Sequence, residues 1–375
     1  MSVFLHPVMK HSFILALSVL LLGSCAQNKT ENMQEQNISL TQEWDKTFPL
    51  SDKVNHEKVT FKTQYGFSLA ADLYIPKETE GKMKAIAVSG PFGAVKEQCS
   101  GLYAMTMAER GFITLAFDPS FTGESSGEPR RTASPDINTE DFMAAVDYLS
   151  LREDVDAEKI GIIGICGWGG IALNAAAADS RIKATAAMTM YDMTRVNGNG
   201  YFDADNSEEA RFAARQAQAI ERMKAATSGN VTPGGGVVDP LPEDATQFVK
   251  DYYDYYKTSR GYHARSGNSN DGWHTFGCQA YANTRFLYYI NEIRNAVLIV
   301  HGEEAHSRYF GENAYAYMMN GQAEGYDAVR QPNPVPENKE LMIIPGASHC
   351  DLYDGGKDKV IPWDKLEDFF NTHLK

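Results

Sequence analysis

The segment KIGIIGICGWGG, residues 159–170, contains the strongest structural signal in the chain. Its continuous apolar run from Ile160 to Ile165 is typical of a strand buried on both faces, and the residues from Gly167 onward predict a helix. Cys166 therefore lies on the turn between strand and helix. Such a turn presents its side chain at the edge of a sheet, and the N-terminus of the helix favours negative charge on the sulfur. We interpret Cys166 as a candidate nucleophile; the alternative is an inert buried cysteine.

Short apolar runs alternate with helical patterns on both sides of this segment. The alternation predicts a mainly parallel, doubly wound α/β sheet with helices on both faces. It stops between Met193 and Arg294, which predicts a cap or lid inserted over the carboxyl edge of the sheet; an independent second domain is the alternative. One of the predicted helices, TEDFMAAVDYLSLRE, begins with Thr139 as its cap. The predicted strands include KAIAVSG (84–90), FITLAFD (112–118), NAVLIVHG (295–302) and KELMIIPG (339–346).

The N-terminal residues predict a targeting segment. MKHSFILALSVLLLGSC, residues 9–25, combines a basic start, an apolar run too short for a comfortable membrane span, and small residues before Cys25. Its end resembles the lipobox of bacterial lipoproteins, which implies acylation of Cys25 and a lipid anchor in the bacterial cell envelope, on the periplasmic or outer surface; an ordinary cleaved signal or a short anchor helix is the alternative. We therefore expect a signal segment at 1–25, a polar tether at 26–50 and a folded domain at 51–375, with its cap at about 193–294.

Composition and charge limit the partners. Of the 375 residues, 43% are hydrophobic and 22% charged, which is ordinary for a globular protein. The formal net charge of -14 comes from scattered acids and argues against nucleic acid or an anionic membrane surface as a partner. We expect a small-molecule substrate, membrane contact only through the N-terminal anchor, and no obligatory protein partner. No dinucleotide motif, phosphate loop or His-rich metal cluster occurs in the sequence, so neither a cofactor nor a metal is expected.

The five cysteines match neither a metal-binding pattern nor a small disulfide scaffold. Cys25 is assigned to the lipid anchor and Cys166 to the candidate site. One bridge among Cys99, Cys278 and Cys350 remains open, because spacing alone does not choose a pair.

Five segments together resemble the dienelactone hydrolase-like branch of the α/β-hydrolase superfamily, over about residues 55–375. The resemblance implies an α/β-hydrolase fold and a Cys-His-acid triad, with Cys166 as nucleophile and His349, which follows the last predicted strand, as base. Two positions depart from that branch, whose members have His at the position of Gly90 and glycine at that of Trp168. The segments are GPFGAVKEQ (90–98), LAFDPSFTGESSGEPR (115–130), DYLSLREDVDAEKIGIIGICGWGG (147–170), VLIVHGEEAHS (297–307) and IPGASHCDLYD (344–354).

The acid of the triad is less well defined than the other two members. Ala305 occupies the position at which the resemblance places it, so Glu303 and Glu304 are the first candidates. Asp192, at the end of the preceding strand, is the other. The resemblance also implies an oxyanion hole.

Two backbone N–H groups are expected to form that oxyanion hole. One belongs to Gly167, next to the nucleophile, and the other to Phe92, in the loop after the first parallel strand. In the adjacent segment, Asp118, Ser125 and Arg130 are expected to organise a turn.

The function implied is hydrolysis of a carboxylic ester, lactone or thioester through an acyl-cysteine intermediate. A thiolate leaves a tetrahedral intermediate more readily than an amine does, which favours these substrates over peptides. Two alternatives remain: a catalytically inactive, lipid-anchored binding protein with the same fold, and a peptidase that uses the same cleft.

Overall fold

The computed structural model describes residues 38–78 and 80–375. Its sheet has eight strands in the order β1-β2-β4-β3-β5-β6-β7-β8. β2 pairs antiparallel with β1 and β4, and all the other neighbours are parallel. This confirms the predicted α/β fold class. The strands are β1 (Val54–Lys62), β2 (Ser68–Pro76), β3 (Met83–Ser89), β4 (Ile113–Phe117), β5 (Val155–Ile165), β6 (Ile182–Met188), β7 (Ala296–Gly302) and β8 (Lys339–Ile344).

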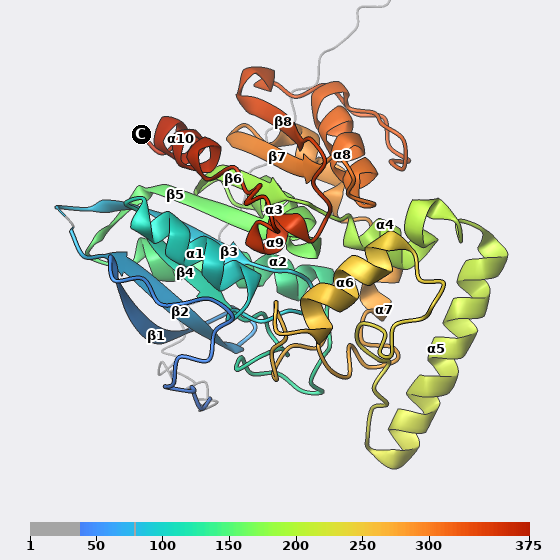
Figure 1. Cartoon of the computed structure of the whole chain (residues 1–375). Coiled ribbons are helices and arrows are strands. Elements are labelled where there is room, and N and C mark those ends of the chain that lie inside the picture. The colour runs from blue at the N-terminus through green and yellow to red at the C-terminus, as the bar shows by residue number, and fades with distance from the viewer. Residues whose placement is uncertain (1–37, 79) are drawn as a thin grey trace, which may run out of the picture. The chain divides into compact units, whose positions relative to one another are not determined.

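Helices cover both faces of the sheet (Figure 1). On β5, Gly161 faces Phe370 of α10, whereas Gly164 faces Trp168 and Ala172 of α3, so these two helices lie on opposite faces. α2 packs against α3, and α1 packs on β3 and β4. These helices are α1 (Cys99–Glu109), α2 (Pro135–Ser150), α3 (Gly167–Ala178), α8 (Arg308–Asn320) and α10 (Trp363–His373).

The start of α2 differs from the prediction. The helix begins at Pro135, with Ser134 at the cap position, and Thr139 lies inside it. The Thr139 hydroxyl donates to the carbonyl oxygen of Pro135 at 2.7 Å, one turn back. Proline is well suited to the first helical turn because its missing N–H has no intrahelical partner there, so the helix starts five residues earlier than the Thr139 signal suggests.

The segment between β6 and β7 is part of the same compact unit, Glu35–Lys375, as the sheet. Its role as a cap over the sheet edge stays a prediction. Figure 1 shows its longest helix, α5, at the outer edge of this unit, with α6 and α7 between α5 and the sheet. The elements of the segment are α4 (Met193–Asn199), η1 (Tyr201–Asp203), α5 (Glu208–Ser228), α6 (Gln247–Lys257), α7 (Gln279–Ala282) and η2 (Leu287–Glu292); η3 (Pro336–Asn338) and α9 (Asp351–Asp354) lie farther along the chain.

The end of the predicted tether is part of the folded unit. Phe48 is buried, and the Trp44 indole N–H donates to its carbonyl oxygen at 2.8 Å. The Lys46 ammonium and the Asp72 carboxylate form a buried ion pair at 2.6 Å. The boundary at residue 50 is therefore wrong, because polar residues in this stretch pair with buried charges of the domain. The signal segment and Cys25 lie outside the described residues, and within the described part of the chain no helix has the length and apolarity needed to cross a membrane.

Candidate active site

Cys166 lies on a sharp turn between β5 and α3, with φ 58° and ψ -127°. Non-glycine residues rarely adopt a positive φ, and such strain often marks a functional position. The turn is fixed by the end of β6 and the residue beyond it: the Cys166 N–H donates to the Met188 carbonyl at 2.9 Å, and the Tyr191 N–H donates to the Cys166 carbonyl at 3.0 Å. The side chain is almost fully buried, with 6% of the residue exposed.

The two predicted oxyanion donors lie at the sulfur. The backbone N–H groups of Gly167 and Phe92 both lie near the Cys166 sulfur and favour its thiolate form. The loop that carries Phe92 is held by the cap, since the Asn268 amide donates to the Phe92 carbonyl at 2.9 Å and the Trp273 ring packs on the Phe92 ring at 4.4 Å. The cap therefore helps to position one of the two donors.

His349 lies in the loop after β8 and is 1% exposed. Its Nδ1 is 2.6 Å from the Ser307 hydroxyl and 2.8 Å from the Thr189 hydroxyl. Its Nε2 is 2.9 Å from the hydroxyl of Tyr353, which lies four residues farther along the chain. Both ring nitrogens therefore have hydroxyl partners that can donate or accept a proton.

The acids predicted for the triad lie elsewhere. The Glu303 carboxylate accepts from the Gly346 N–H at 3.0 Å, and both Glu303 and Glu304 are exposed. Asp192 caps α4, where it accepts from the backbone N–H groups of Thr194 and Arg195. Among the residues described, no carboxylate contacts His349, and the place expected for the acid is taken by the two hydroxyls at Nδ1.

The Tyr353 hydroxyl lies near both Cys166 and His349. It is 2.9 Å from Nε2 of His349 and favours the thiolate form of Cys166. No hydrogen bond joins Cys166 directly to His349 among the described contacts. A second, longer path leads from Cys166 through the Tyr252 and Tyr191 hydroxyls, which are 3.0 Å apart, to Nε2 of His306. Sequence analysis did not identify these tyrosines or His306 as part of the site. Only Tyr353 offered a signal, because it lies four positions after His349, which is the spacing of one helical turn.

Burial sets the charge state of the resting site. It raises the pKa of the Cys166 thiol, although the hydroxyls of Tyr353 and Tyr252 and the two backbone N–H groups oppose the shift. It holds the pKa of His349 well below its usual range, assisted by His306 and His301. The Gly167 N–H at the helix N-terminus lowers the thiol pKa as expected, but desolvation is the larger effect and the net shift is upward. Burial thus favours a neutral thiol and a neutral imidazole.

We expect alkylation of Cys166 by iodoacetamide to increase with pH through a midpoint above 9, because the pKa of the buried thiol is raised from 9.0 and only the thiolate reacts. We also expect kcat/KM to stay constant between pH 8 and pH 6.5. Burial holds the pKa of His349 well below 6.5, so its imidazole stays neutral and can act as a base throughout this range. Peptide mass spectrometry after timed labelling measures the first effect, and initial rates measure the second. A labelling midpoint below pH 8 would contradict this charge state.

A cavity of about 300 Å³ opens over Cys166. Aromatic and glycine residues from the sheet edge and the cap form most of its walls, and none of the described lining residues is acidic. The lining residues are Phe92, Cys166, Tyr191, Met193, Val196, Tyr201, Gly235, Gly236, Val237, Tyr252, Asn268, Gly272, Trp273 and Tyr353.

Gly90 and Trp168, the two positions that depart from the dienelactone hydrolase-like pattern, lie next to each other in the structure. Gly90 has φ +108°, and a Cβ there would lie 2.8 Å from the Cβ of Trp168 and 2.2 Å from the Ile165 carbonyl oxygen. The Trp168 ring is buried and packs edge-on against Phe117 and Phe142, at 5.6 and 5.2 Å. The side chain at 168 therefore fills space beside the elbow that a larger residue at 90 would need.

Gly90→Ala is expected to lower the free energy of unfolding by about 3 kcal/mol, because it adds a backbone collision to an unfavourable φ. Gly111→Ala is the matched control, since Gly111 has φ +94° and nothing within 4 Å of its Cβ position; we expect a loss of about 1 kcal/mol there. Urea denaturation measures both. Equal losses in the two variants would show that the collision does not matter.

A buried carboxylate cluster beside the Phe92 loop is closed by a lysine. The carboxylates of Glu97, Asp118 and Glu124 lie within metal-binding distance of one another. The Lys96 ammonium contacts all three, at 2.7, 2.8 and 2.6 Å. Lys58 also contacts Glu97 and Glu124, at 3.6 and 3.4 Å, and Arg265 contacts Glu97 at 2.8 Å, so three cations balance the three carboxylates and the cluster is structural.

The turn after β4 is organised as expected. The Asp118 carboxylate accepts from the Glu124 N–H at 2.9 Å, the Ser125 hydroxyl donates to the Asp118 carbonyl at 2.6 Å, and Arg130 donates to the Gly123 carbonyl at 2.7 Å. The four described cysteines, Cys99, Cys166, Cys278 and Cys350, are unpaired.

The chain is similar to several curated proteins, including the following three. It is 54% identical to the uncharacterized protein PA2218 of Pseudomonas aeruginosa over 346 residues, which cover 92% of this chain and 86% of that protein. It is 32% identical to the uncharacterized protein YcjY of Escherichia coli over 311 residues, 80% of this chain and 93% of that one. It is also 32% identical to the thiohydrolase aneE of Aspergillus aculeatus, but only over 133 residues, 36% of this chain and 41% of the relative.

Solved structures and a family model define the relationship. The crystal structure of PA2218 superposes with a TM-score of 0.82 at 53% identity and covers 90% of this chain and 99% of its own. The α/β hydrolase GrgF from a Penicillium species has a TM-score of 0.65 at 20% identity, covers 85% and 99%, and shows the shared fold alone. The sequence model described as X-Pro dipeptidyl-peptidase (S15 family) matches residues 66–347, more than half of the chain. The chain therefore belongs to the S15 family and has the α/β-hydrolase fold.

Proposed function

We propose that the protein hydrolyses thioesters and activated carboxylic esters, lactones included, through an acyl intermediate on Cys166. One observation carries the proposal: Cys166 lies on a strained turn, near two backbone N–H donors and near the Tyr353 hydroxyl, which in turn contacts a buried histidine. A core cysteine has no need of any of these features.

In the proposed reaction the thiol proton passes to the Tyr353 oxygen while the Tyr353 proton passes to Nε2 of His349, as the sulfur attacks the carbonyl carbon. The oxyanion accepts hydrogen bonds from the N–H groups of Gly167 and Phe92. The bond to the leaving group breaks, and the proton on His349 returns through Tyr353 to that group. Water then attacks the carbonyl carbon of the acyl-cysteine while its proton passes by the same path to His349; the C–S bond breaks, the carboxylic acid is released, and the proton returns to the Cys166 sulfur to restore the thiol.

Ser307 and Thr189 take the positioning role in this proposal. Either hydroxyl can accept the Nδ1 proton of His349, which leaves Nε2 free to accept from Tyr353. A hydroxyl stabilises an imidazolium less than a carboxylate does, which agrees with the lowered pKa of His349. With two hydroxyls in place of a carboxylate, His349 is a weaker general base. The site therefore suits substrates with good leaving groups, because their cleavage needs less help from a base.

Peptide hydrolysis is the second candidate, since the family name refers to a dipeptidyl-peptidase. Such an enzyme holds the free α-ammonium of its substrate, and a buried carboxylate is the usual partner for that charge. The described lining of the cavity over Cys166 offers none. The name of the relative aneE, a thiohydrolase, agrees with thioester chemistry at such a site.

The test uses one acyl group with three leaving atoms: a butyryl thioester, 4-nitrophenyl butyrate and butyryl 4-nitroanilide, together with Gly-Pro 4-nitroanilide. We expect the thioester and the ester to be cleaved at least about 10³-fold faster than both anilides, because the anilide nitrogen leaves less readily than the Cys166 thiolate. Faster cleavage of Gly-Pro 4-nitroanilide would establish the peptidase instead. No turnover of any of the four would favour the inactive binding protein.

We further propose that the protein acts in the bacterial cell envelope, held by acylation of Cys25. The support is the sequence of residues 9–25 alone. Metabolic labelling with a palmitate analogue in a bacterial host is expected to mark the wild-type chain and not Cys25→Ser. Equal labelling of the two chains would reject the anchor.

A further inference from the structure

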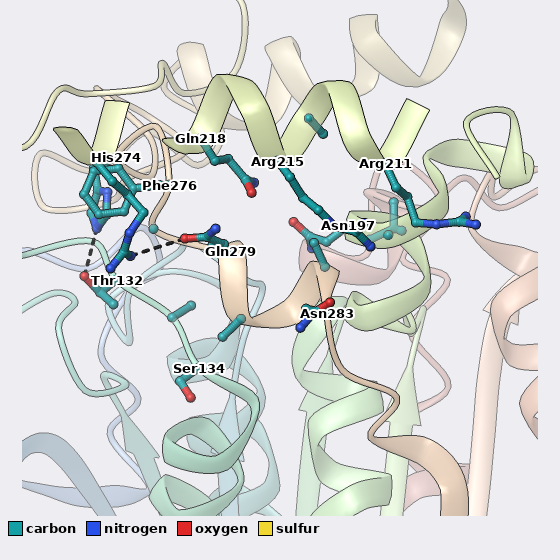
Figure 2. A pocket seen from close by; sticks show the side chains of 18 of the residues that line it. Thr132, Ser134, Asn197, Arg211, Arg215, Gln218, His274, Phe276, Gln279 and Asn283 are labelled. Atoms are coloured by element: carbon teal, nitrogen blue, oxygen red, sulfur yellow. Dashed lines mark hydrogen bonds between the residues drawn. The ribbon is translucent and has the colours of Figure 1, made fainter. Parts of the chain in front are cut away.

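A second and larger cavity, of about 1030 Å³, lies beneath helix α5. Its walls are the inner side of α5, the helices α4 and α7, and the loop that leads into α2 (Figure 2). None of the residues of α5 is buried, so the helix does not close down on the space under it. We call this space the α5 cavity.

Positive charge is concentrated on the α5 wall. Arg211, Arg215 and Arg222 all line the cavity. They are spaced at i, i+4 and i+11, which places them within about 40° of one line along a helix that turns about 100° per residue. Of the described lining residues, Asp205 alone is acidic.

These arginines lack the partners that arginines of this protein usually have. Arg211 donates to the Asn206 amide oxygen at 2.6 Å and Arg222 to the Gln279 amide oxygen at 3.2 Å, while Arg215 has no hydrogen bond or ion pair to any described residue. Neutral amides satisfy a donor but do not neutralise a charge. By contrast, nine other arginines have a carboxylate within 4 Å: Arg110, Arg131, Arg152, Arg181, Arg195, Arg260, Arg265, Arg308 and Arg330.

The opposite wall supplies neutral hydrogen-bonding groups. Figure 2 shows Gln279 on α7 and Asn283, which directly follows α7, across from Arg211 and Arg215, with Asn197 between them. Amide side chains bind the hydroxyl, carbonyl and anionic oxygens of a ligand without adding charge. In a chain of net charge -14, a pocket with three arginines and one acid is a local exception that suits an anion.

The α5 cavity adjoins the cavity over Cys166. Val196 of α4 lines both cavities. Farther along the chain, Gly200 lines the α5 cavity, and the next residue, Tyr201, lines the cavity over Cys166. A substrate whose acyl carbon lies at Cys166 can therefore extend past Val196 toward the arginines.

We propose that the α5 cavity binds an anionic group, a carboxylate or a phosphate, at the end of the substrate remote from the bond cleaved at Cys166. This inference rests on the proposed hydrolysis and adds the class of substrate to it. A guanidinium pairs with either anion through two parallel hydrogen bonds, which fixes orientation as well as charge. Arg215, which has no partner, is the first contact, and Arg211 and Arg222 contribute through the field they create.

The test compares 4-nitrophenyl esters of equal length whose far end is a methyl, a carboxylate or a phosphate, over several chain lengths. The readout is the ratio of kcat/KM for the charged ester to that for the methyl ester. In Arg215→Gln this ratio is expected to fall about tenfold, the equivalent of 1.4 kcal/mol. Lys224→Gln, which removes the same charge from the part of α5 outside the cavity, is expected to leave it unchanged. The ester whose ratio falls more identifies the anion.

A ratio that is the same in wild type and Arg215→Gln at every length would overturn the inference. To separate this from failure of the hydrolysis, binding of glutarate and of inorganic phosphate to Cys166→Ala is measured by calorimetry, with and without Arg215→Gln. Binding that is lost with Arg215 while no ester is cleaved would reject the proposed chemistry and keep the site. Ester cleavage with no effect of Arg215→Gln on the kcat/KM ratio or on anion binding would keep the proposed chemistry and reject the anion site.

Discussion

Replacement of Cys166 by alanine is expected to lower kcat/KM for 4-nitrophenyl butyrate at least about 10³-fold, because it removes the atom that forms the acyl bond. The two backbone N–H donors stay in place, so some stabilisation of an oxyanion persists and the residual rate is not zero. Stopped-flow or steady-state release of nitrophenolate measures the loss. Cys166 is packed among buried residues and alanine is smaller, so circular dichroism should confirm that the variant folds.

Cys278→Ala is the matched control. Cys278 is also unpaired but lies in the cap outside both cavities, and we expect its removal to change kcat/KM less than twofold. Cys166→Ser does not discriminate, because the same relay can activate a serine hydroxyl. Activity of Cys166→Ala within tenfold of wild type would reject the nucleophile.

His349→Ala is expected to reduce kcat/KM about 10³-fold as well, because the proton of the thiol then has no acceptor beyond Tyr353. The acid limb of the pH profile, set by the lowered pKa of His349, should disappear with it. Measured rates of wild type and variant between pH 5 and 9 test both statements.

His306→Ala serves as the control for the second path. His306 reaches Cys166 only through two tyrosine hydroxyls, so its loss should cost less than about tenfold. The loss of kcat/KM in Tyr353→Phe should lie between the losses in His306→Ala and His349→Ala, because this change breaks the relay but leaves the imidazole and water in the site. A larger loss in His306→Ala than in His349→Ala would transfer the role of base to His306.

The sequence predicted the fold and the position of Cys166 on the turn between strand and helix, because both depend on local pattern. The apolar run of β5 and the glycines after it determine where strand, turn and helix meet, and Cys166 and Gly167 follow from that turn. Gly90 and Trp168 stood out as departures, but only the distance between them shows that they share one space.

The partners of His349 could not be found in the same way. Thr189, Ser307 and Tyr353 come from three different segments, which follow β6, β7 and β8, and their convergence depends on how far each strand projects at the sheet edge. The charge state of Cys166 was mispredicted for a related reason, since the degree of burial comes from the cap and not from the turn. The tether boundary failed because the partner of Lys46, Asp72, is distant in sequence.

The most direct measurement is mass spectrometry of the enzyme quenched with acid during turnover of 4-nitrophenyl butyrate, followed by digestion at low pH. The account predicts one added butyryl group, on the peptide that contains Cys166, which disappears when the ester is exhausted. A butyryl group on Tyr353 or on another residue, or continued turnover with Cys166 unmodified at every time point, would contradict it.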